Sequence, residues 1–155
     1  MKTLIICVSI HHGNTEKIAK AMAEVLNAKL VKPSEVNINE LSKYDLIGFG
    51  SGIYEGKHHK TLLNFVDKLS QLQNKKAFIF STRWIGPVQL YHKSLRNKLL
   101  EKNFDVIGEF SCKGFIDYSF TKYIFGGLNK KRPNEKDLKK AKDFVRGFKN
   151  NSSKE

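Results

Sequence analysis

Short apolar runs alternate along this chain with stretches whose apolar residues recur every three or four positions. The runs contain β-branched and aromatic residues and are too short for helices, so each predicts a strand buried on both faces. They are residues 4–8, 44–51, 77–81 and 104–112. The periodic stretches predict amphipathic helices with one face toward a core. Their apolar stripes are Ile18, Ala19, Met22, Val25 and Leu26; Leu62, Leu63, Phe65, Val66 and Leu69; Leu90, Tyr91, Leu95, Leu99 and Leu100; and Leu138, Ala141, Phe144, Val145 and Phe148.

A fifth strand is indicated more weakly, between the first helix and the second apolar run. Leu30 and Val31 are its apolar residues, and Pro33 ends it because proline lacks the backbone donor of a ladder. A short, partly polar strand of this kind belongs at a sheet edge. The connection that follows, residues 34–43, is polar. Its apolar residues, expected to cover the sheet, are Val36, Ile38 and Leu41.

Strands and helices thus alternate five times, which predicts a parallel sheet covered on both faces and joined by right-handed crossovers. The fold class is therefore α/β, a three-layer, doubly wound, five-stranded parallel sheet. A single domain is expected over residues 1–150, because no linker or repeat interrupts the chain. Pro133 and Asn134 indicate the start of the last helix, and residues 151–155 are expected to form a disordered tail. Gly108 predicts a bulge or a close approach in the fourth apolar run.

The turn between the first strand and the first helix is a candidate anion site. The first N–H groups of a helix lack internal partners, and the helix dipole places partial positive charge there. Gly13 permits a close approach or an unusual φ, Ser9 and Thr15 supply hydroxyls, and Asn14 can cap or donate. An ordinary strand-to-helix loop with an Asn or Thr cap explains the same residues without any ligand.

Two further loops are expected at the same edge as this turn, because a doubly wound sheet binds its ligand beyond the carboxyl ends of its strands. Residues 51–59 follow the second apolar run, and residues 81–87 follow the third. His58 and His59 are interpreted as loop or cap residues. Adjacent histidines point apart on a helix, so no metal site made by both is expected.

Composition narrows the function classes. The net charge of +13 favours acidic partners, but the chain has no recognition helix, zinc-finger spacing or aromatic RNA-binding motif, so nucleic acid is not the expected partner. No segment approaches the roughly 18 apolar residues of a membrane helix, and no secretory signal opens the chain, so a cytoplasmic protein is expected. Cys7 and Cys112 lie in apolar runs and are expected to be reduced core residues.

The motifs at this edge resemble those of the flavodoxin family. Residues 9–15, Ser-Ile-His-His-Gly-Asn-Thr, are similar to its phosphate-binding loop, usually Thr/Ser-x-Thr/Ser-Gly-x-Thr. Residues 50–59 resemble the second flavin-contacting loop of short bacterial and archaeal members. Residues 112–115, 126–130 and 132–135 are similar to the end of the same proteins. The resemblance covers nearly the whole chain in the family's order, and it implies a sheet of order 2-1-3-4-5 with non-covalently bound FMN.

The resemblance also implies a set of cofactor-binding residues. Backbone N–H groups from His11 to Thr15, with the side chains of Ser9, Asn14 and Thr15, would hold the phosphate. The second loop would run along the flavin ring, where the Glu55–Gly56 peptide could turn over on reduction, because glycine tolerates both conformers. Tyr54 and Trp84 could stack on opposite sides of the ring, or simply pack against the protein. The full set is Ser9, His11, His12, Gly13, Asn14, Thr15, Gly52, Ile53, Tyr54, Glu55, Gly56, Lys57, Thr82, Arg83, Trp84, Ile85 and Gly86.

Three features depart from the family pattern. His12 replaces a hydroxyl residue of the phosphate loop, and the loop at 83–87 is bulkier and more basic than expected. Electron-carrying flavodoxins are usually acidic, whereas this chain is strongly basic. These departures leave FMN binding possible and bear mainly on the partner, for which an acidic redox protein is expected.

Three functions follow from these observations. The first is a low-potential electron carrier or small flavin reductase that uses FMN. The second is an FMN-dependent oxidoreductase with an acidic organic substrate, since flavodoxin-type protoporphyrinogen oxidases are similar around residues 50–59 and are basic. The chain lacks the long insertion of that group before the last strand. The third is a basic binding module that has kept the fold and lost the flavin. No catalytic residue is assigned, and whether the chain is an enzyme stays open.

Overall fold

A computed structural model describes residues 1–10, 13–114 and 131–152 of the chain. The segments 11–12, 115–130 and 153–155 lie outside the described residues. The strands are β1 (Thr3–Val8), β2 (Lys29–Val31), β3 (Leu46–Tyr54), β4 (Lys57–His58), β5 (Lys75–Arg83) and β6 (Phe104–Lys113). The α-helices are α1 (Asn14–Leu26), α2 (Lys60–Asp67), α3 (Val88–Glu101) and α5 (Glu135–Ser152). Two 3₁₀-helices, η1 (Pro33–Glu35) and η2 (Ile38–Lys43), follow β2.

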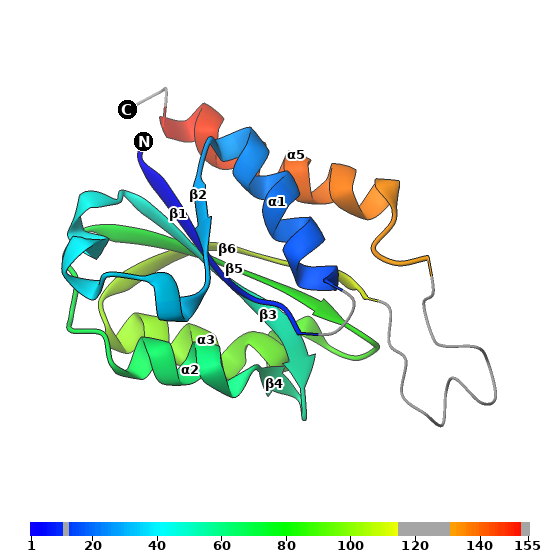
Figure 1. Ribbon diagram of the computed structural model, residues 1–155, viewed down its shortest axis with the longest axis horizontal. Coiled ribbons are helices and arrows are strands. Elements are labelled where there is room, and N and C mark those ends of the chain that lie inside the picture. The colour runs from blue at the N-terminus through cyan, green and yellow to red at the C-terminus, as the bar shows by residue number, and fades with distance from the viewer. Residues whose placement is uncertain (11–12, 115–130, 153–155) are drawn as a thin grey trace.

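The sheet has the predicted topology. Five strands pair in parallel in the order β2-β1-β3-β5-β6, which is the predicted order 2-1-3-4-5 once the short β4 is set aside. Strand β4 pairs antiparallel with the end of β3. Because the strands are parallel, their carboxyl ends meet at one edge, and this edge receives the loops from β1, β3 and β5 (Figure 1). The α/β fold class is confirmed.

Helices cover both faces of the sheet, α1 and α5 on one side and α2 and α3 on the other (Figure 1). Alternate strand residues point to opposite faces, so each apolar run feeds two cores. Toward α1 and α5 the buried side chains include Ile5, Met22, Phe78, Phe80 and Val145. Toward α2 and α3 they include Ile6, Phe49, Ile79, Leu95 and Leu99.

Three residues predicted for the core are exposed. Leu41 is buried and Val36 is partly buried, as predicted, but Ile38 begins η2 and is exposed. In α3, Leu95 and Leu99 are buried, whereas Leu90 and Leu100 are exposed. Leu90 and Leu100 are exposed because the buried stripe of α3 is narrow and consists of His92, Leu95 and Leu99. A polar residue therefore takes the place that the pattern assigned to Leu90.

Gly108 serves both predicted purposes in β6. The register with β5 shifts by one residue there, which is the irregularity of a bulge. A Cβ at Gly108 would also lie 3.1 Å from ring atoms of Phe144 and Phe148 of α5. The bulge thus brings the edge strand close to the last helix.

Helix α5 begins with a reciprocal cap, as Pro133 and Asn134 predicted. The N–H of Asp137 donates to Oδ1 of Asn134 at 3.1 Å, and the N–H of Asn134 donates to Oδ2 of Asp137 at 2.8 Å. Arg132 adds a 2.6 Å ion pair to the buried Asp137. The helix continues through Ser152, so the predicted boundary of the tail after residue 150 is two residues too early for this helix.

Replacing Asn134 with alanine should lower the free energy of unfolding by about 1 kcal/mol, because the substitution removes a side-chain acceptor for the helix N-terminus. Chemical denaturation followed by far-UV circular dichroism measures this change. Asn151→Ala, near the exposed end of the same helix, serves as the control and should change stability by less than about 0.5 kcal/mol. Equal effects at the two positions would contradict the capping role of Asn134.

Both cysteines are buried and free, Cys7 in β1 and Cys112 in β6. Burial raises the pKa of each thiol to about 12, so neither is a thiolate at neutral pH. In the part of the chain that the structure describes, no helix has the length and apolar character needed to cross a membrane.

Candidate functional site

Gly13, at the helix side of the turn between β1 and α1, has the unusual φ that its sequence position suggested. Gly13 occupies the cap position of α1 in the left-handed region, with φ of 62°. The hydroxyl of Ser9 accepts a hydrogen bond from the N–H of Glu16 at 3.2 Å, so Ser9 closes the turn onto the helix and keeps its own hydroxyl proton for another acceptor. His11 and His12 lie outside the described residues.

A pair of buried threonine hydroxyls joins the start of α1 to the end of β5. Oγ1 of Thr15 lies 2.7 Å from Oγ1 of Thr82, and both residues are buried. Two hydroxyls carry two protons, and one bond between them uses only one. The pair can therefore donate its second proton to an acceptor near the helix N-terminus. Sequence reasoning had selected both threonines without relating them to each other.

Gly114 closes the other side of this turn. A Cβ there would lie 2.9 Å from Nδ2 of Asn14 and 3.2 Å from the Cβ of Thr82. The N–H of Gly114 also donates to the carbonyl oxygen of Arg83 at 3.0 Å, which fixes the end of β6 against the end of β5. Gly114 was not among the predicted site residues. The tight packing that requires a glycine there depends on three distant segments, so no local pattern reveals it.

The second predicted loop is a β-hairpin. Strand β3 continues to Tyr54, the chain turns at Glu55 and Gly56, and β4 returns with Lys57 opposite Tyr54. Both turn residues have positive φ, 51° and 77°, as a two-residue type I′ turn requires. The prediction of a loop over residues 51–59 is therefore wrong for this segment, although it placed the segment at the correct edge of the sheet.

The third predicted loop divides between strand and turn. Thr82 and Arg83 are the last residues of β5, while Trp84 and Ile85 follow it with 46% and 64% of their surfaces exposed. Tyr91 of α3 fixes the turn, because its hydroxyl donates to the carbonyl oxygen of Ile85 at 2.7 Å. Gly86 has φ of 118°, and a Cβ there would lie 2.0 Å from that hydroxyl oxygen. The apolar side chains after β5 thus face solvent on a well-fixed turn.

The structure brings the described members of the predicted site to the carboxyl edge of β1, β3 and β5 (Figure 1). Tyr54 lies over Gly52, where a Cβ would be 2.9 Å from the phenol oxygen, and its ring makes an edge contact with His59 at 5.2 Å between centroids. Stacking of Tyr54 and Trp84 on a flavin remains a prediction. The described members are Ser9, Gly13, Asn14, Thr15, Gly52, Ile53, Tyr54, Glu55, Gly56, Lys57, Thr82, Arg83, Trp84, Ile85 and Gly86.

Sequence reasoning missed a buried polar cluster beneath this edge. His92 of α3 has no exposed surface, and its Nε2 lies 2.7 Å from Oγ of the equally buried Ser81. Its Nδ1 lies 3.0 Å from Oε2 of Glu109, which also accepts two hydrogen bonds from Arg96. Burial opposes ionisation of Glu109, but the hydrogen bonds from Arg96 and His92 hold the pKa of its carboxyl below the ordinary value.

This cluster has the order of a serine–histidine–carboxylate triad but not its accessibility. Ser81 and His92 are fully buried, so no substrate reaches the hydroxyl, and we assign no nucleophile there. The signal that could have revealed the cluster is the position of His92 seven residues before Leu99 and three before Leu95, on the buried stripe of a helix.

The two adjacent histidines have different environments. His59 is the cap residue of α2, and its Nδ1 accepts from the N–H of Thr61 at 3.1 Å, as one of the two interpretations expected. His58 has only 1% of its surface exposed and lies in β4, with Nδ1 3.0 Å from Oγ of Ser51. The interpretation of His58 as a loop or cap residue is therefore wrong, because the hairpin turns it into the interior.

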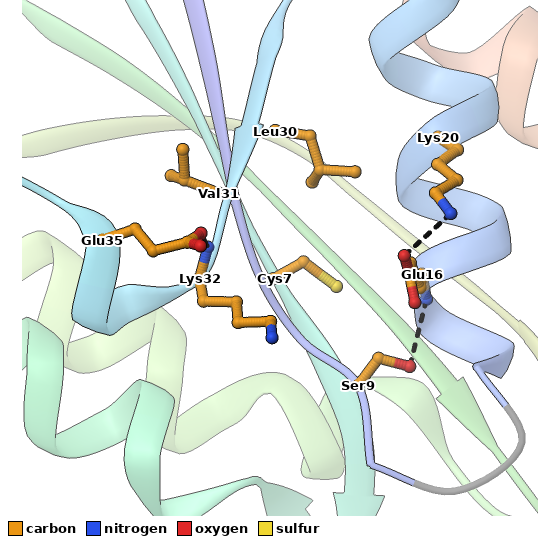
Figure 2. A pocket seen from close by; sticks show the side chains of 8 residues that line it. All are labelled: Cys7, Ser9, Glu16, Lys20, Leu30, Val31, Lys32 and Glu35. Carbon is orange, nitrogen blue, oxygen red and sulfur yellow. Dashed lines mark hydrogen bonds and ion pairs between the residues drawn. The ribbon is translucent and has the colours of Figure 1, made fainter.

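A cleft of about 250 Å³ lies beside β1, between β2 and the start of α1. Figure 2 shows Cys7 and Ser9 facing this space, with Glu16 bonded to both Ser9 and Lys20. The ion pair of Glu16 with Lys20 is 2.8 Å long and leaves neither charge uncompensated. Lys32 also lines the cleft, so cationic side chains stand there beside Glu16, whereas the turn at the helix N-terminus offers backbone and hydroxyl donors. Among the described residues, no group of three or more histidine, cysteine or carboxylate side chains could hold a metal ion.

Comparison with known proteins identifies the family. A family model described as a flavodoxin domain matches residues 5–124, more than three quarters of the chain. The chain belongs to the flavodoxin family. It is also 54% identical over 149 residues to an uncharacterised protein of the archaeon Methanocaldococcus jannaschii, a match that covers 96% of this chain and 98% of that one.

Solved flavodoxins share the fold at low sequence identity. The fold is similar to that of an archaeal flavodoxin, with a TM-score of 0.63 at 17% identity over 94% of both chains. Flavodoxin 2 of Bacillus cereus has a TM-score of 0.71 at 20% identity and covers 97% of this chain and 99% of its own. The rubredoxin oxygen:oxidoreductase of Desulfovibrio gigas matches 94% of this chain with 34% of its length, at a TM-score of 0.71 and 18% identity. The likeness establishes the fold.

The described residues are compatible with the flavin nucleotide of this family. A helix N-terminus with Gly13 at its cap and hydroxyls of Ser9 and the threonine pair supplies donors for a phosphate ester. Exposed apolar side chains of Trp84 and Ile85 supply a surface for a planar ring. Donors and apolar surface lie at the same edge, as a nucleotide with an aromatic base requires.

Proposed function

We propose that this chain binds FMN non-covalently and acts as a low-potential electron carrier or small flavin reductase. The turn between β1 and α1 carries the proposal, because it combines a left-handed Gly13 with hydroxyl donors at a helix N-terminus in a member of the flavodoxin family. Neither the turn nor the family membership alone would suffice, since common loops share the first feature and related folds serve many functions.

The phosphate would be held by the backbone N–H groups of residues 11–15 with the side chains of Ser9, Asn14 and Thr15. The hairpin from Gly52 to Lys57 would lie along the ring, with Tyr54 and Trp84 as its aromatic contacts. When bound, FMN supplies the electron-transfer chemistry. The chain's own contribution is to bind the phosphate, to orient the ring, and to present or withhold backbone donors and acceptors at its edge through the Glu55–Gly56 turn.

The net charge of +13 supports an acidic redox protein as the partner. Complementary charge accelerates encounter and gives a rate that falls as salt rises. A cytoplasmic location is part of the same proposal.

Purified protein incubated with excess FMN and then desalted should be yellow, with close to one FMN for each chain and quenched flavin fluorescence. Visible absorbance against protein concentration measures this ratio. A low-potential electron donor should then bleach the flavin absorbance, and slower bleaching by a reduced acidic redox protein at high salt would support charge steering. A colourless protein after desalting would contradict the proposal and favour the flavin-free binding module. Turnover of protoporphyrinogen would favour the oxidoreductase instead.

A further inference from the structure

Three serines stand in one row across the sheet, directly before the segments expected to contact the flavin. Ser51 of β3 pairs in register with Ser81 of β5, which pairs with Ser111 of β6. The row lies on the sheet face that α2 and α3 cover, because Phe49 and Ile79, two positions earlier in β3 and β5, belong to that core. Two of the serines bind a buried histidine each.

His58 ties the hairpin to the sheet through the first serine. The hydroxyl of Ser51 donates to the carbonyl oxygen of Gly52 at 2.7 Å, and its oxygen accepts from the N–H of His59 at 2.9 Å. With its proton used in this way, Oγ of Ser51 is the acceptor for Nδ1 of His58 at 3.0 Å. The neutral ring therefore carries its proton on Nδ1. Its Nε2 has no hydrogen-bond partner among the described residues.

His92 connects the same hairpin to α3. The rings of His58 and His92 lie 5.0 Å apart between centroids, with their planes inclined by 41°. His92 is itself fixed on both sides, by Ser81 at Nε2 and by Glu109 at Nδ1. Since β4 contains only Lys57 and His58, this ring contact and the bond to Ser51 are its side-chain attachments to the interior that the structure describes.

We propose that His58 and His92 are positioning residues for the flavin, and that through their tilted ring contact they hold the hairpin of residues 52–57 in the conformation that receives the isoalloxazine ring. The inference rests on the proposed function, because the hairpin is assigned to the ring there. It adds two residues that do not contact the ligand and a dependence of FMN binding on their protonation.

Protonation of His58 would break this arrangement. The charged and titratable groups that face the two rings are His58 and His92 themselves, Arg83 of β5, Arg96 of α3 and Glu109 of β6. Burial, and then the neighbouring His92, holds the pKa of His58 well below its ordinary value of 6.5. A second proton on His58 would sit at Nε2, which has no acceptor among the described residues.

The direction of the pH effect follows from this pKa. A hairpin detached from α3 exposes His58 and returns its pKa to about 6.5, so the detached state binds more protons than the attached one. The attached conformation is fully favoured above pH 6.5 and loses population as the pH falls below it, down to the pKa of the buried ring. Linkage with one such proton raises the ratio of detached to attached hairpin by about 10-fold between pH 7.5 and pH 5.5, and FMN binding weakens as the attached fraction falls.

Quenching of FMN fluorescence measures the dissociation constant across this range for three chains: wild type, His58→Asn and His59→Asn. The asparagine at position 58 retains a donor for Ser51 and does not titrate, so the affinity of this variant for FMN should fall less between pH 7.5 and pH 5.5 than that of the wild type, with about 10-fold as the largest difference. His59→Asn should keep the wild-type dependence. The FMN phosphate has a second pKa of about 6, and its titration contributes equally to all three chains. Equal pH dependence in wild type and His58→Asn would overturn the inference.

A measurement without FMN separates this inference from the proposed function. Hydrogen exchange of the FMN-free wild type should show protection factors at the amides of residues 53–59 that fall about 10-fold from pH 7.5 to pH 5.5, while those of β1 stay constant. If no FMN binds at any pH, the proposed function is wrong. Hydrogen exchange alone then tests whether the two histidines hold the hairpin. Constant protection of the hairpin would overturn the inference. This test uses the wild type alone, so it holds even if His58→Asn does not fold.

Discussion

Replacing Gly50 with alanine should destabilise the protein more than any other single-methyl change proposed here. A Cβ at position 50 would lie 2.2 Å from Cε2 and Cζ of Phe80, a separation at which something must move. Gly50 faces Phe80 across the β3–β5 pair, and the ring is fully buried beneath α1 and α5. We expect a loss of about 3 kcal/mol or more, because overpacking forces the ring off its rotamer or the strands apart.

Urea denaturation followed by circular dichroism measures this loss, which corresponds to a fall in melting temperature of about 10 °C for a chain of this size. Gly147→Ala is the matched control, since a Cβ there has no atom within 4 Å. In the interior of α5 that substitution should raise the stability by about 0.5–1 kcal/mol. Combining Gly50→Ala with Phe80→Leu should recover part of the loss. A destabilisation by Gly50→Ala below about 1 kcal/mol would show that the ring adapts freely.

The fold was predictable because the same features repeat along the chain. The buried strands are short apolar runs, the helices have one apolar stripe each, and the rule for doubly wound sheets places three loops at one edge. The weak strand at Leu30 and Val31 was correctly assigned to the sheet edge because Pro33 follows it. In α3 the helical period also fits Leu90 and Leu100, which were therefore wrongly predicted to be buried. His92 occupies the buried position instead.

The candidate site was predictable as a set of segments but not as an arrangement. The hairpin was missed because Glu-Gly is not a usual type I′ sequence, and the non-glycine Glu55 takes a positive φ that only the strand pairing around it explains. The serine row depends on strand register, which links residues thirty positions apart. Ser51 and Ser81 each end an apolar run and so resembled the beginning of a loop.

The contact between Thr15 and Thr82 shows the same limit and has the clearest functional consequence. Both were predicted site residues, but their separation of 67 positions conceals that they share a hydrogen bond. Thr15 thereby links α1 to β5, and we expect its hydroxyl to donate toward the helix N-terminus as well. The two roles of Thr15 can be separated by substituting Thr15 and Thr82 one at a time.

Thr15→Ala should weaken FMN binding by about 10- to 100-fold at pH 7.5, because a hydrogen bond to a charged group contributes about 1.5–3 kcal/mol. Thr82→Val removes the bond between the threonines but leaves the Thr15 hydroxyl free to donate, so the affinity should change by less than about 5-fold. Fluorescence titration measures both dissociation constants, and thermal unfolding without FMN measures the structural cost of each substitution.

Thr61→Ala is the matched control, because Thr61 is the second residue of α2 as Thr15 is of α1, and the substitution keeps the backbone donor that bonds to His59. It should leave FMN affinity unchanged. If Thr15→Ala and Thr82→Val weaken FMN binding equally, the threonine pair acts only by holding α1 to β5, and the phosphate does not accept from Thr15. If neither weakens binding, the phosphate lies elsewhere than at this helix N-terminus, since a donor buried beside the bound group could not be lost without effect.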